Sequence, residues 1–148
     1  MESIGPVTID SSVYLSARFS DEPTHAACRE LLQLLRDDRR QLILPLLVQP
    51  EVAGNLARRI GNAEAAAAHA ASLLRGEHVT PVPLGSGLAA EAAQLAAEYR
   101  LRGADAVFAA VAQRYGSILI TCDREQRERA APFVRTLTPG EALEELGG

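Results

Sequence analysis

Four carboxylates occupy positions that a parallel sheet would bring together. Asp10 ends a β-prone apolar run at the start of the chain, and Asp123 follows a second such run at residues 117–121. The carboxyl ends of parallel strands share one edge of a sheet, where open α/β folds place their sites. Glu51 and Asp105 lie near the starts of expected helices that follow strand-to-helix loops. We therefore expect all four acids at the same edge.

A cluster of four carboxylates is stable only if its negative charge is balanced. Converging carboxylates repel one another, and each raises the pKa of the others. A divalent cation removes this repulsion, and an all-oxygen ligand set without His or Cys suits Mg²⁺ or Mn²⁺. A bound ion of this kind lowers the pKa of water and polarises a phosphoryl oxygen. The acids therefore predict a metal-dependent site for hydrolysis.

Each acid also has a purely structural explanation. Glu51 and Asp105 fall in first helical turns, where an acid complements the helix dipole. Asp10 and Asp123 could cap turns at strand ends. The combination favours a site, because four independent coincidences would have to share one edge. Thr121 lies two residues before Asp123 on the expected strand, so the two side chains share a face and Cys122 points the other way.

The order of expected elements predicts an α/β fold with a mostly parallel sheet of about five strands, flanked by helices. Pro81 and Pro83 suit only an edge strand. Gly61 is expected to end one helix and Asn62 to cap the next. Apolar stripes that end at Ile60 and at Tyr115 are expected to face the core, as is Tyr99. The expected strands cover residues 7–9, 41–44, 78–82, 117–121 and 134–137, and the expected helices cover 24–36, about 48–60, 63–74, 88–99, 104–115, 124–130 and 139–146.

Composition narrows the class of protein. The 148 residues fit one domain, residues 1–148, with no visible linker. A net charge of −4 argues against a nucleic-acid binder held by bulk charge alone, and all 15 basic residues are Arg. We find no apolar run long enough to span a membrane and no leader pattern in residues 1–6, so a cytoplasmic location is expected. Cys28 and Cys122 lack metal-ligand spacing and are expected to be reduced thiols.

Four segments carry a resemblance to a known family. Val-Thr-Ile-Asp-Ser-Ser-Val at residues 7–13 resembles the opening motif of PIN-domain proteins. Leu-Arg-Gly-Ala-Asp-Ala-Val-Phe-Ala-Ala at 101–110, the most specific segment, resembles the third-acid helix of VapC-like toxins. Residues 118–123 resemble the fourth-acid strand, and residues 48–52 resemble the second-acid helix. The match runs from about residue 7 to residue 136. One departure is the loop after Asp123, which has Arg124 and Glu125 where the family often has an aromatic residue.

The resemblance implies a PIN-like fold and a metal-dependent endoribonuclease, the toxin of a type II toxin–antitoxin pair. It implies hydrolysis of RNA by metal-activated water, a homodimer and an antitoxin protein as partner. By resemblance, the metal ligands and catalytic residues are Asp10, Glu51, Asp105 and Asp123, the ion is Mg²⁺ or Mn²⁺, and Ser11 and Thr121 lie beside it. Guanidinium groups bind phosphate bidentately. The arginines expected near the crevice are Arg18, Arg102, Arg124 and Arg127, with ordinary solvated surface as the alternative for each.

Two other functions stay open. A PIN-like scaffold could bind RNA or protein without cleaving, and a processing nuclease could act outside a toxin–antitoxin module. A small antitoxin-like reading frame beside this one would favour the toxin. A receiver domain would need a Lys near the last strand, and this chain has none. A haloacid-dehalogenase-type phosphatase would need a second acid two residues after Asp10, where Ser12 stands.

Several further features have ordinary structural explanations. The Gly-x-Gly-x-x-Ala pattern at residues 85–90 follows a proline-broken strand late in the chain, so a loop and a helix start explain it better than a dinucleotide site. His25, His69 and His78 have no ligand spacing and are expected to be structural or exposed.

Overall fold

The computed structural model describes residues 5–147, built around a five-stranded sheet in the order β3-β2-β1-β4-β5. Most of residues 1–6, where the sequence predicts no leader, lies outside these residues. Each pair of neighbouring strands in the sheet is parallel, which confirms the predicted α/β class. The strands are β1 Val7–Ile9, β2 Leu42–Pro45, β3 Val79–Val82, β4 Ile118–Ile120 and β5 Thr136–Leu137.

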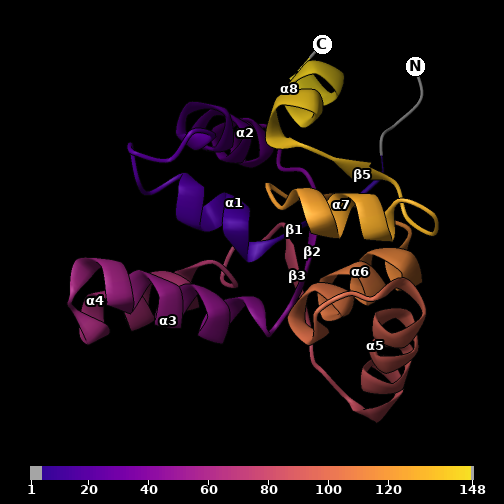
Figure 1. The fold of residues 1–148 in the computed structure, drawn as a ribbon. Helices are drawn as coiled ribbons and strands as arrows, with labels where there is room; N and C mark the ends of the chain where they lie inside the picture. Colours follow the sequence, from indigo (N-terminus) through magenta and orange to yellow (C-terminus); the bar gives the residue numbers. More distant parts are fainter. Residues whose placement is uncertain (1–4, 148) are drawn as a thin grey trace.

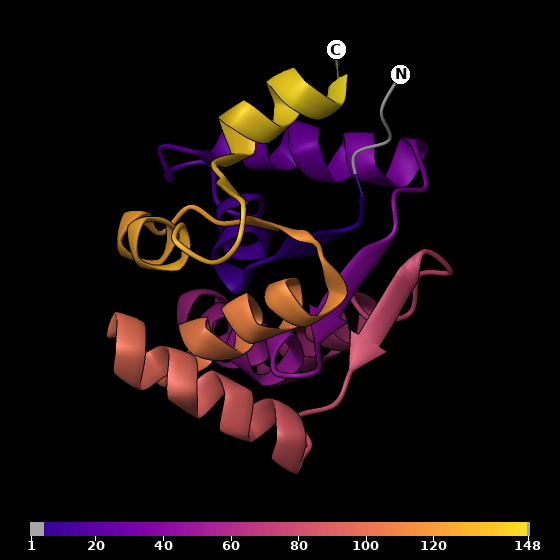
Figure 2. The same cartoon turned by 90° about the vertical axis from the view of Figure 1, so that its right-hand side faces the viewer.

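Helices connect the strands and cover both faces of the sheet. They are α1 Ser11–Ser16, α2 His25–Asp37, α3 Val48–Ile60, α4 Ala63–Ser72, α5 Ser86–Tyr99, α6 Gly103–Tyr115, α7 Arg124–Ala130 and α8 Pro139–Gly147. Figure 1 shows α3 and α4 together on one side of the molecule and α5 with α6 on the other. Figure 2 shows α2 and α8 above the strands and α5 and α6 below them. None of the helices within residues 5–147 is long and apolar enough to cross a membrane.

The central helix of the core is α6, which packs against β1, β2 and β4. Its residues 106–112 are all buried, and four of these seven positions are alanine. Small side chains let the helix backbone approach the sheet closely, while Phe108, which is fully buried, fills the remaining space. This packing fixes the start of α6, and therefore Asp105, relative to the ends of β1 and β4.

Local signals in the sequence set several helix ends as predicted. Gly61 ends α3 with a positive φ of 66°, a conformation that costs other residues about 1 kcal/mol or more. Asn62 then caps α4, its side chain accepting a hydrogen bond from the Ala65 N–H at 3.0 Å. The proline-containing strand β3 lies at the edge of the sheet, also as predicted.

Three expectations need correction. The six-residue helix α1 was not predicted, because it is too short to show a helical period. Ile60 and Tyr115 were expected in the core, yet they are 37% and 42% exposed. Each is the last residue of its helix, where the apolar stripe continues past the neighbouring elements. Tyr99, also expected to face the core, is partly buried and packs against it, with its ring centroid 4.6 Å from that of Phe133.

Candidate active site

The pairing of β1 with β4 places two predicted site residues side by side. Ile9 is in register with Ile120, and the N–H of Asp10 donates to the carbonyl of Ile120 at 3.0 Å. Asp10 and Thr121, the next residue of each strand, therefore meet at the carboxyl edge of the sheet. The Thr121 hydroxyl lies 3.0 Å from Asp10 Oδ2.

Asp10 is buried and held by hydrogen bonds. It caps α1, because its Oδ2 accepts a bond from the Ser12 N–H at 3.2 Å. Burial raises the pKa of the Asp10 carboxyl, and the nearby charge of Asp123 adds to this, while the bonds from Ser12 and Thr121 oppose it. Asp10 is thus an oriented acid at the end of β1, with 5% of its surface exposed.

Glu51 faces Asp10 from the first turn of α3. The Ser11 hydroxyl donates a hydrogen bond to Glu51 Oε1 and so joins α1 to α3. Burial raises the pKa of Glu51, the charge of Asp10 adds to the increase, and the bond from Ser11 opposes it. Ser11, which was predicted beside the site, therefore fixes the position of one of the four acids.

Asp105 lies in the first turn of α6. Burial, together with the charges of Asp10, Asp123 and Glu51, raises the pKa of Asp105 to about 7, and the nearby Arg102 opposes the increase. Within residues 5–147, no donor makes a hydrogen bond to this carboxylate. Arg102 is the one group among the described residues that lowers the pKa of Asp105.

Thr121 joins the acids into one network. Fully buried, it accepts a hydrogen bond at Oγ1 from the Asp123 N–H at 3.0 Å. The same hydroxyl lies 3.0 Å from Asp10 Oδ2 and 2.9 Å from Gln126 Oε1. One hydroxyl has one proton, so Thr121 donates to only one of these two acceptors at a time. The protonation state of Asp10 is thereby coupled to the Gln126 amide.

Two members of the network were missed from the sequence. Gln126 is fully buried, and its Nε2 donates to the backbone carbonyl of Asp105 at 3.3 Å. Its N–H donates to Asp123 Oδ1 at 3.2 Å, which caps α7. Ser12 accepts at Oγ from the Cys122 N–H at 3.1 Å. An Asp followed three residues later by Gln marks a helix start, but that signal does not show where the Gln side chain points.

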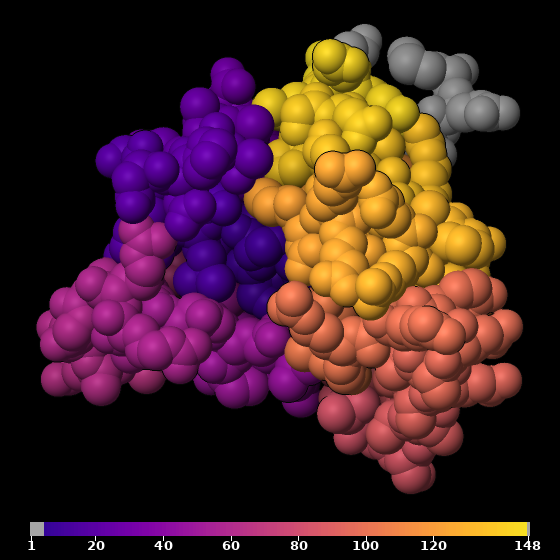
Figure 3. All heavy atoms as spheres, in the orientation of Figure 1, coloured from indigo at the N-terminus to yellow at the C-terminus, as the bar shows by residue number. Residues whose placement is uncertain are grey.

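The four acids lie at the starts of α1, α3, α6 and α7, as caps or in the first turn. Figure 3 shows a hollow on the front face, where the dark atoms of α1 are set back between α3 and the segments of α6 and α7. Within residues 5–147, no group of three or more His, Cys, Asp or Glu side chains is close enough to hold a metal ion. Asp10 and Asp123 instead cap helices. The carboxylate oxygens are ligands of the type that Mg²⁺ and Mn²⁺ prefer. The charges of Asp10, Asp123 and Glu51 raise the pKa of Asp105, so the four acids interact electrostatically.

The four predicted arginines are distributed unevenly. Arg102 lowers the pKa of Asp105 through its charge, and it is exposed with Glu125 at 3.7 Å. Arg127 donates to the Thr121 carbonyl at 3.2 Å. Arg124 is exposed and paired with Glu128 at 2.8 Å. The fourth, Arg18, lies in a pocket whose lining includes none of the four acids.

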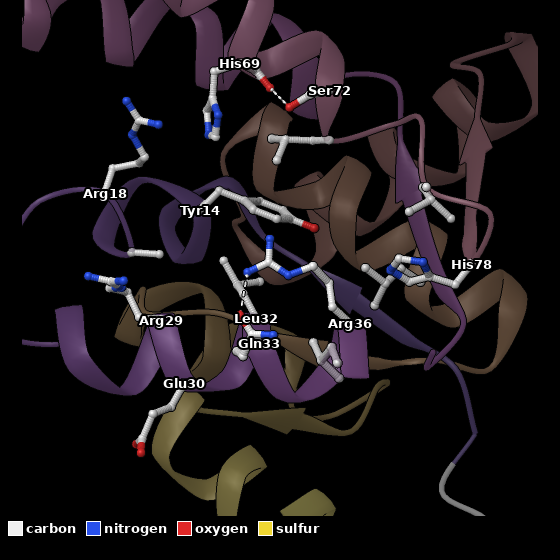
Figure 4. A pocket seen from close by; sticks show the side chains of 16 residues that line it. Tyr14, Arg18, Arg29, Glu30, Leu32, Gln33, Arg36, His69, Ser72 and His78 are labelled. Atoms are coloured by element: carbon white, nitrogen blue, oxygen red, sulfur yellow. Dashed lines mark hydrogen bonds between the residues drawn. The ribbon is translucent and has the colours of Figure 1, made fainter. Parts of the chain in front are cut away.

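This pocket has a volume of about 540 Å³ and lies between α1, α2, α4 and the edge of the sheet. Figure 4 shows the hydroxyl of Tyr14 directed into it beside Arg36. Burial raises the pKa of Tyr14, and its hydroxyl has no hydrogen-bond partner within residues 5–147. No carboxylate among the described residues forms an ion pair with Arg18, Arg29 or Arg36. The pocket therefore combines excess positive charge with an apolar floor.

The parallel sheet, with acids at its carboxyl edge, is that of an α/β protein. The family model described as the PIN domain matches residues 7–132, and this chain belongs to that family. Whether residues 1–148 form a single domain stays a prediction. No curated protein matches the sequence.

Solved structures share the fold. VapC20 of Mycobacterium tuberculosis, a toxin that cleaves the sarcin–ricin loop, is 21% identical with a TM-score of 0.70, covering 86% of this chain and 96% of its own. PAE2754 of Pyrobaculum aerophilum is 21% identical with a TM-score of 0.68, covering 97% and 96%. A toxin–antitoxin complex of Klebsiella pneumoniae is 20% identical with a TM-score of 0.63, covering 90% and 97%. At these identities the likeness shows the fold alone.

Proposed function

We propose that this protein is a metal-dependent endoribonuclease that hydrolyses phosphodiester bonds of RNA as the toxin of a toxin–antitoxin pair. The observation that carries the proposal is the electrostatic coupling at the sheet edge, where Asp10, Asp123 and Glu51 help to raise the pKa of Asp105 to about 7. Membership of the PIN family supports it. So does the likeness to VapC20, which cleaves the sarcin–ricin loop. We propose a cytoplasmic location, where such a substrate would be found.

Each residue has a role in this proposal. Asp10, Glu51, Asp105 and Asp123 would hold Mg²⁺ or Mn²⁺, which when bound supplies activated water and stabilises charge on a phosphoryl oxygen. Thr121 orients Asp10 through Oδ2, and Ser11 orients Glu51 through Oε1. Asp105 releases a proton as the site fills, because its pKa lies near neutrality. The exposed Arg102 would bind an RNA phosphate, together with Arg124 and Arg127 of α7.

Calorimetric titration with Mn²⁺ tests the metal site directly. We expect wild type to bind one or more ions with release of protons, and affinity to rise between about pH 6 and pH 8, because Asp10, Glu51 and Asp105 all have raised pKa values. Asp10→Ala should lose most of this affinity. Asp38→Ala, which removes an exposed acid at the end of α2, should retain it. Equal binding by wild type and Asp10→Ala would remove Asp10 from the site.

The cationic pocket supports the proposed antitoxin partner. Arg18, Arg29 and Arg36 supply positive charge that no carboxylate of residues 5–147 pairs with. Leu32 and Leu73 supply an apolar floor. Figure 4 shows Glu30, an acid of the lining, pointing away from Arg18 and Tyr14. A partner segment with carboxylates and apolar side chains would complement both features. One of the structures of this fold, from Klebsiella pneumoniae, is described as a toxin–antitoxin complex.

We also propose a homodimer, supported by apolar surface. Large hydrophobic side chains remain exposed at Leu46, Ile60, Leu84 and Tyr115, with Leu84 at 47%. Light scattering across a dilution series should give twice the 15.8 kDa chain mass at micromolar concentration. Mass that stays at one chain throughout the series would contradict the dimer without affecting the nuclease proposal.

A further inference from the structure

The two cysteines of the chain are in contact. Cys28 lies on α2 and Cys122 in the loop between β4 and α7, 94 positions apart, yet their Sγ atoms are 3.5 Å apart. Both are free thiols. The Thr24 hydroxyl also lies 3.5 Å from Cys122 Sγ. Because these are the only cysteines in 148 residues, the fold has brought every thiol of the chain to one place.

The surroundings suit the two thiols to different roles. Cys28 is fully buried on a helix that packs on the core, whereas Cys122 is partly exposed. A small oxidant from solvent therefore reaches Cys122 first. The Cys28 thiol then lies beside the oxidised sulfur of Cys122. A disulfide has its sulfur atoms about 2.0 Å apart. Bond formation thus requires an approach of about 1.5 Å, which the loop of Cys122 can make more easily than α2.

We propose that Cys28 and Cys122 form an oxidative modification site, closed by an intramolecular disulfide when the protein meets a hydroperoxide. The Cys122 sulfur attacks the O–O bond of hydrogen peroxide, which gives a sulfenic acid and one water. The Cys28 sulfur then displaces the hydroxyl group, which forms the S–S bond and releases a second water. Two thiols lose two electrons and two protons in total, and the peroxide is reduced. An external dithiol reverses the reaction by exchange.

The disulfide also acts on the candidate active site, a consequence that rests on the proposed function. Cys122 stands between Thr121 and Asp123, and its N–H donates to Ser12 Oγ at 3.1 Å. Pulling Cys122 toward α2 displaces both neighbours relative to Asp10. Loss of support around a metal ligand costs roughly 10–100-fold in metal affinity or activity. We therefore expect the oxidised protein to bind Mn²⁺ and cleave RNA at least about tenfold more weakly than the reduced protein.

Mass spectrometry of the full chain tests the modification itself. After treatment with hydrogen peroxide and denaturation, the protein should have lost about 2 Da, should accept no iodoacetamide and should remain a single chain without reductant. Dithiothreitol should restore two alkylatable thiols. In Cys28→Ser the disulfide should be absent and Cys122 should gain about 16 Da as a sulfenic acid. Reduced Cys28→Ser should cleave RNA like wild type, because Cys28 makes no contact with the four acids.

The outcomes separate the two proposals. Two alkylatable thiols after peroxide treatment, or a cross-link between two chains, would overturn the modification site. A disulfide without loss of Mn²⁺ affinity would support the modification site and overturn its effect on the acids. A reduced protein that cleaves no RNA would instead contradict the nuclease, and the mass measurement would still decide the disulfide.

Discussion

Asp105→Asn should abolish RNA cleavage while leaving the fold intact. The substitution keeps the shape and one oxygen of the side chain but removes a charge from the cluster. Metal affinity should fall, and cleavage should fall on the order of 100-fold or more, since even residues that only support a ligand contribute up to about 100-fold. Cleavage of an RNA identified by mapping the transcripts cut in cells is the assay.

Thermal melts in EDTA distinguish this interpretation from a structural one. The pKa of Asp105 is raised from 3.8 to about 7, so the folded protein binds the proton more tightly than the unfolded chain. The contribution of Asp105 to stability is therefore present at low pH and is lost as pH rises from about 4 to about 7. Asp105→Asn removes that loss. Its melting temperature near pH 8 should equal or exceed that of wild type, and its pH dependence should be flatter.

An acid that only complements the helix dipole behaves in the opposite way. Its removal costs about 0.3–1 kcal/mol and leaves cleavage unchanged. Glu64, the exposed first-turn acid of α4, provides the matched control as Glu64→Gln. Retained cleavage in Asp105→Asn, with a lowered melting temperature like that of Glu64→Gln, would exclude Asp105 from the site and weaken the whole four-acid argument.

The sequence predicted those features that follow from chain direction and local geometry. A parallel sheet brings the carboxyl ends of its strands to one edge, so the positions of Asp10 and Asp123 followed once the strands were recognised. Gly61 and Asn62 mark helix boundaries through their own backbone preferences. Pro81 could belong only to an edge strand, since it cannot donate a ladder hydrogen bond.

Features that depend on side-chain packing between distant segments could not be predicted. In the sequence, Gln126 is a polar residue in a polar helical segment. Only the packing of α7 in the folded protein buries it between Thr121 and the carbonyl of Asp105. Cys28 and Cys122 are far apart in the sequence, and nothing in their spacing indicates that they are in contact. Arg18 was expected near the crevice, but it follows the far end of helix α1 and lines the pocket instead.

Thr121→Val should impair the site through positioning, since valine has nearly the same shape but no hydroxyl. Gln126 Oε1 would lose its donor and the Asp123 N–H its acceptor, while Asp10 Oδ2 would keep only the bond from the Ser12 N–H. Leaving such buried groups without partners costs about 1–3 kcal/mol of stability. The hydrogen bond from Thr121 lowers the pKa of Asp10, so its loss would raise that pKa. A proton on Asp10 would then compete more strongly with the metal ion. Mn²⁺ affinity and cleavage should therefore both fall roughly 10–100-fold.

Thr8→Val separates this effect from a general loss of stability. Thr8 is equally buried, and its hydroxyl donates to the Ile43 carbonyl at 2.8 Å and contacts Ser117 Oγ at 2.6 Å, within the sheet and away from the acids. The two variants should lose similar stability in urea unfolding, because each leaves buried polar groups without partners. Only Thr121→Val should shift the metal titration toward higher pH and reduce cleavage. Equal Mn²⁺ affinity and equal cleavage in the two variants would mean that Thr121 supports the fold and not the acids.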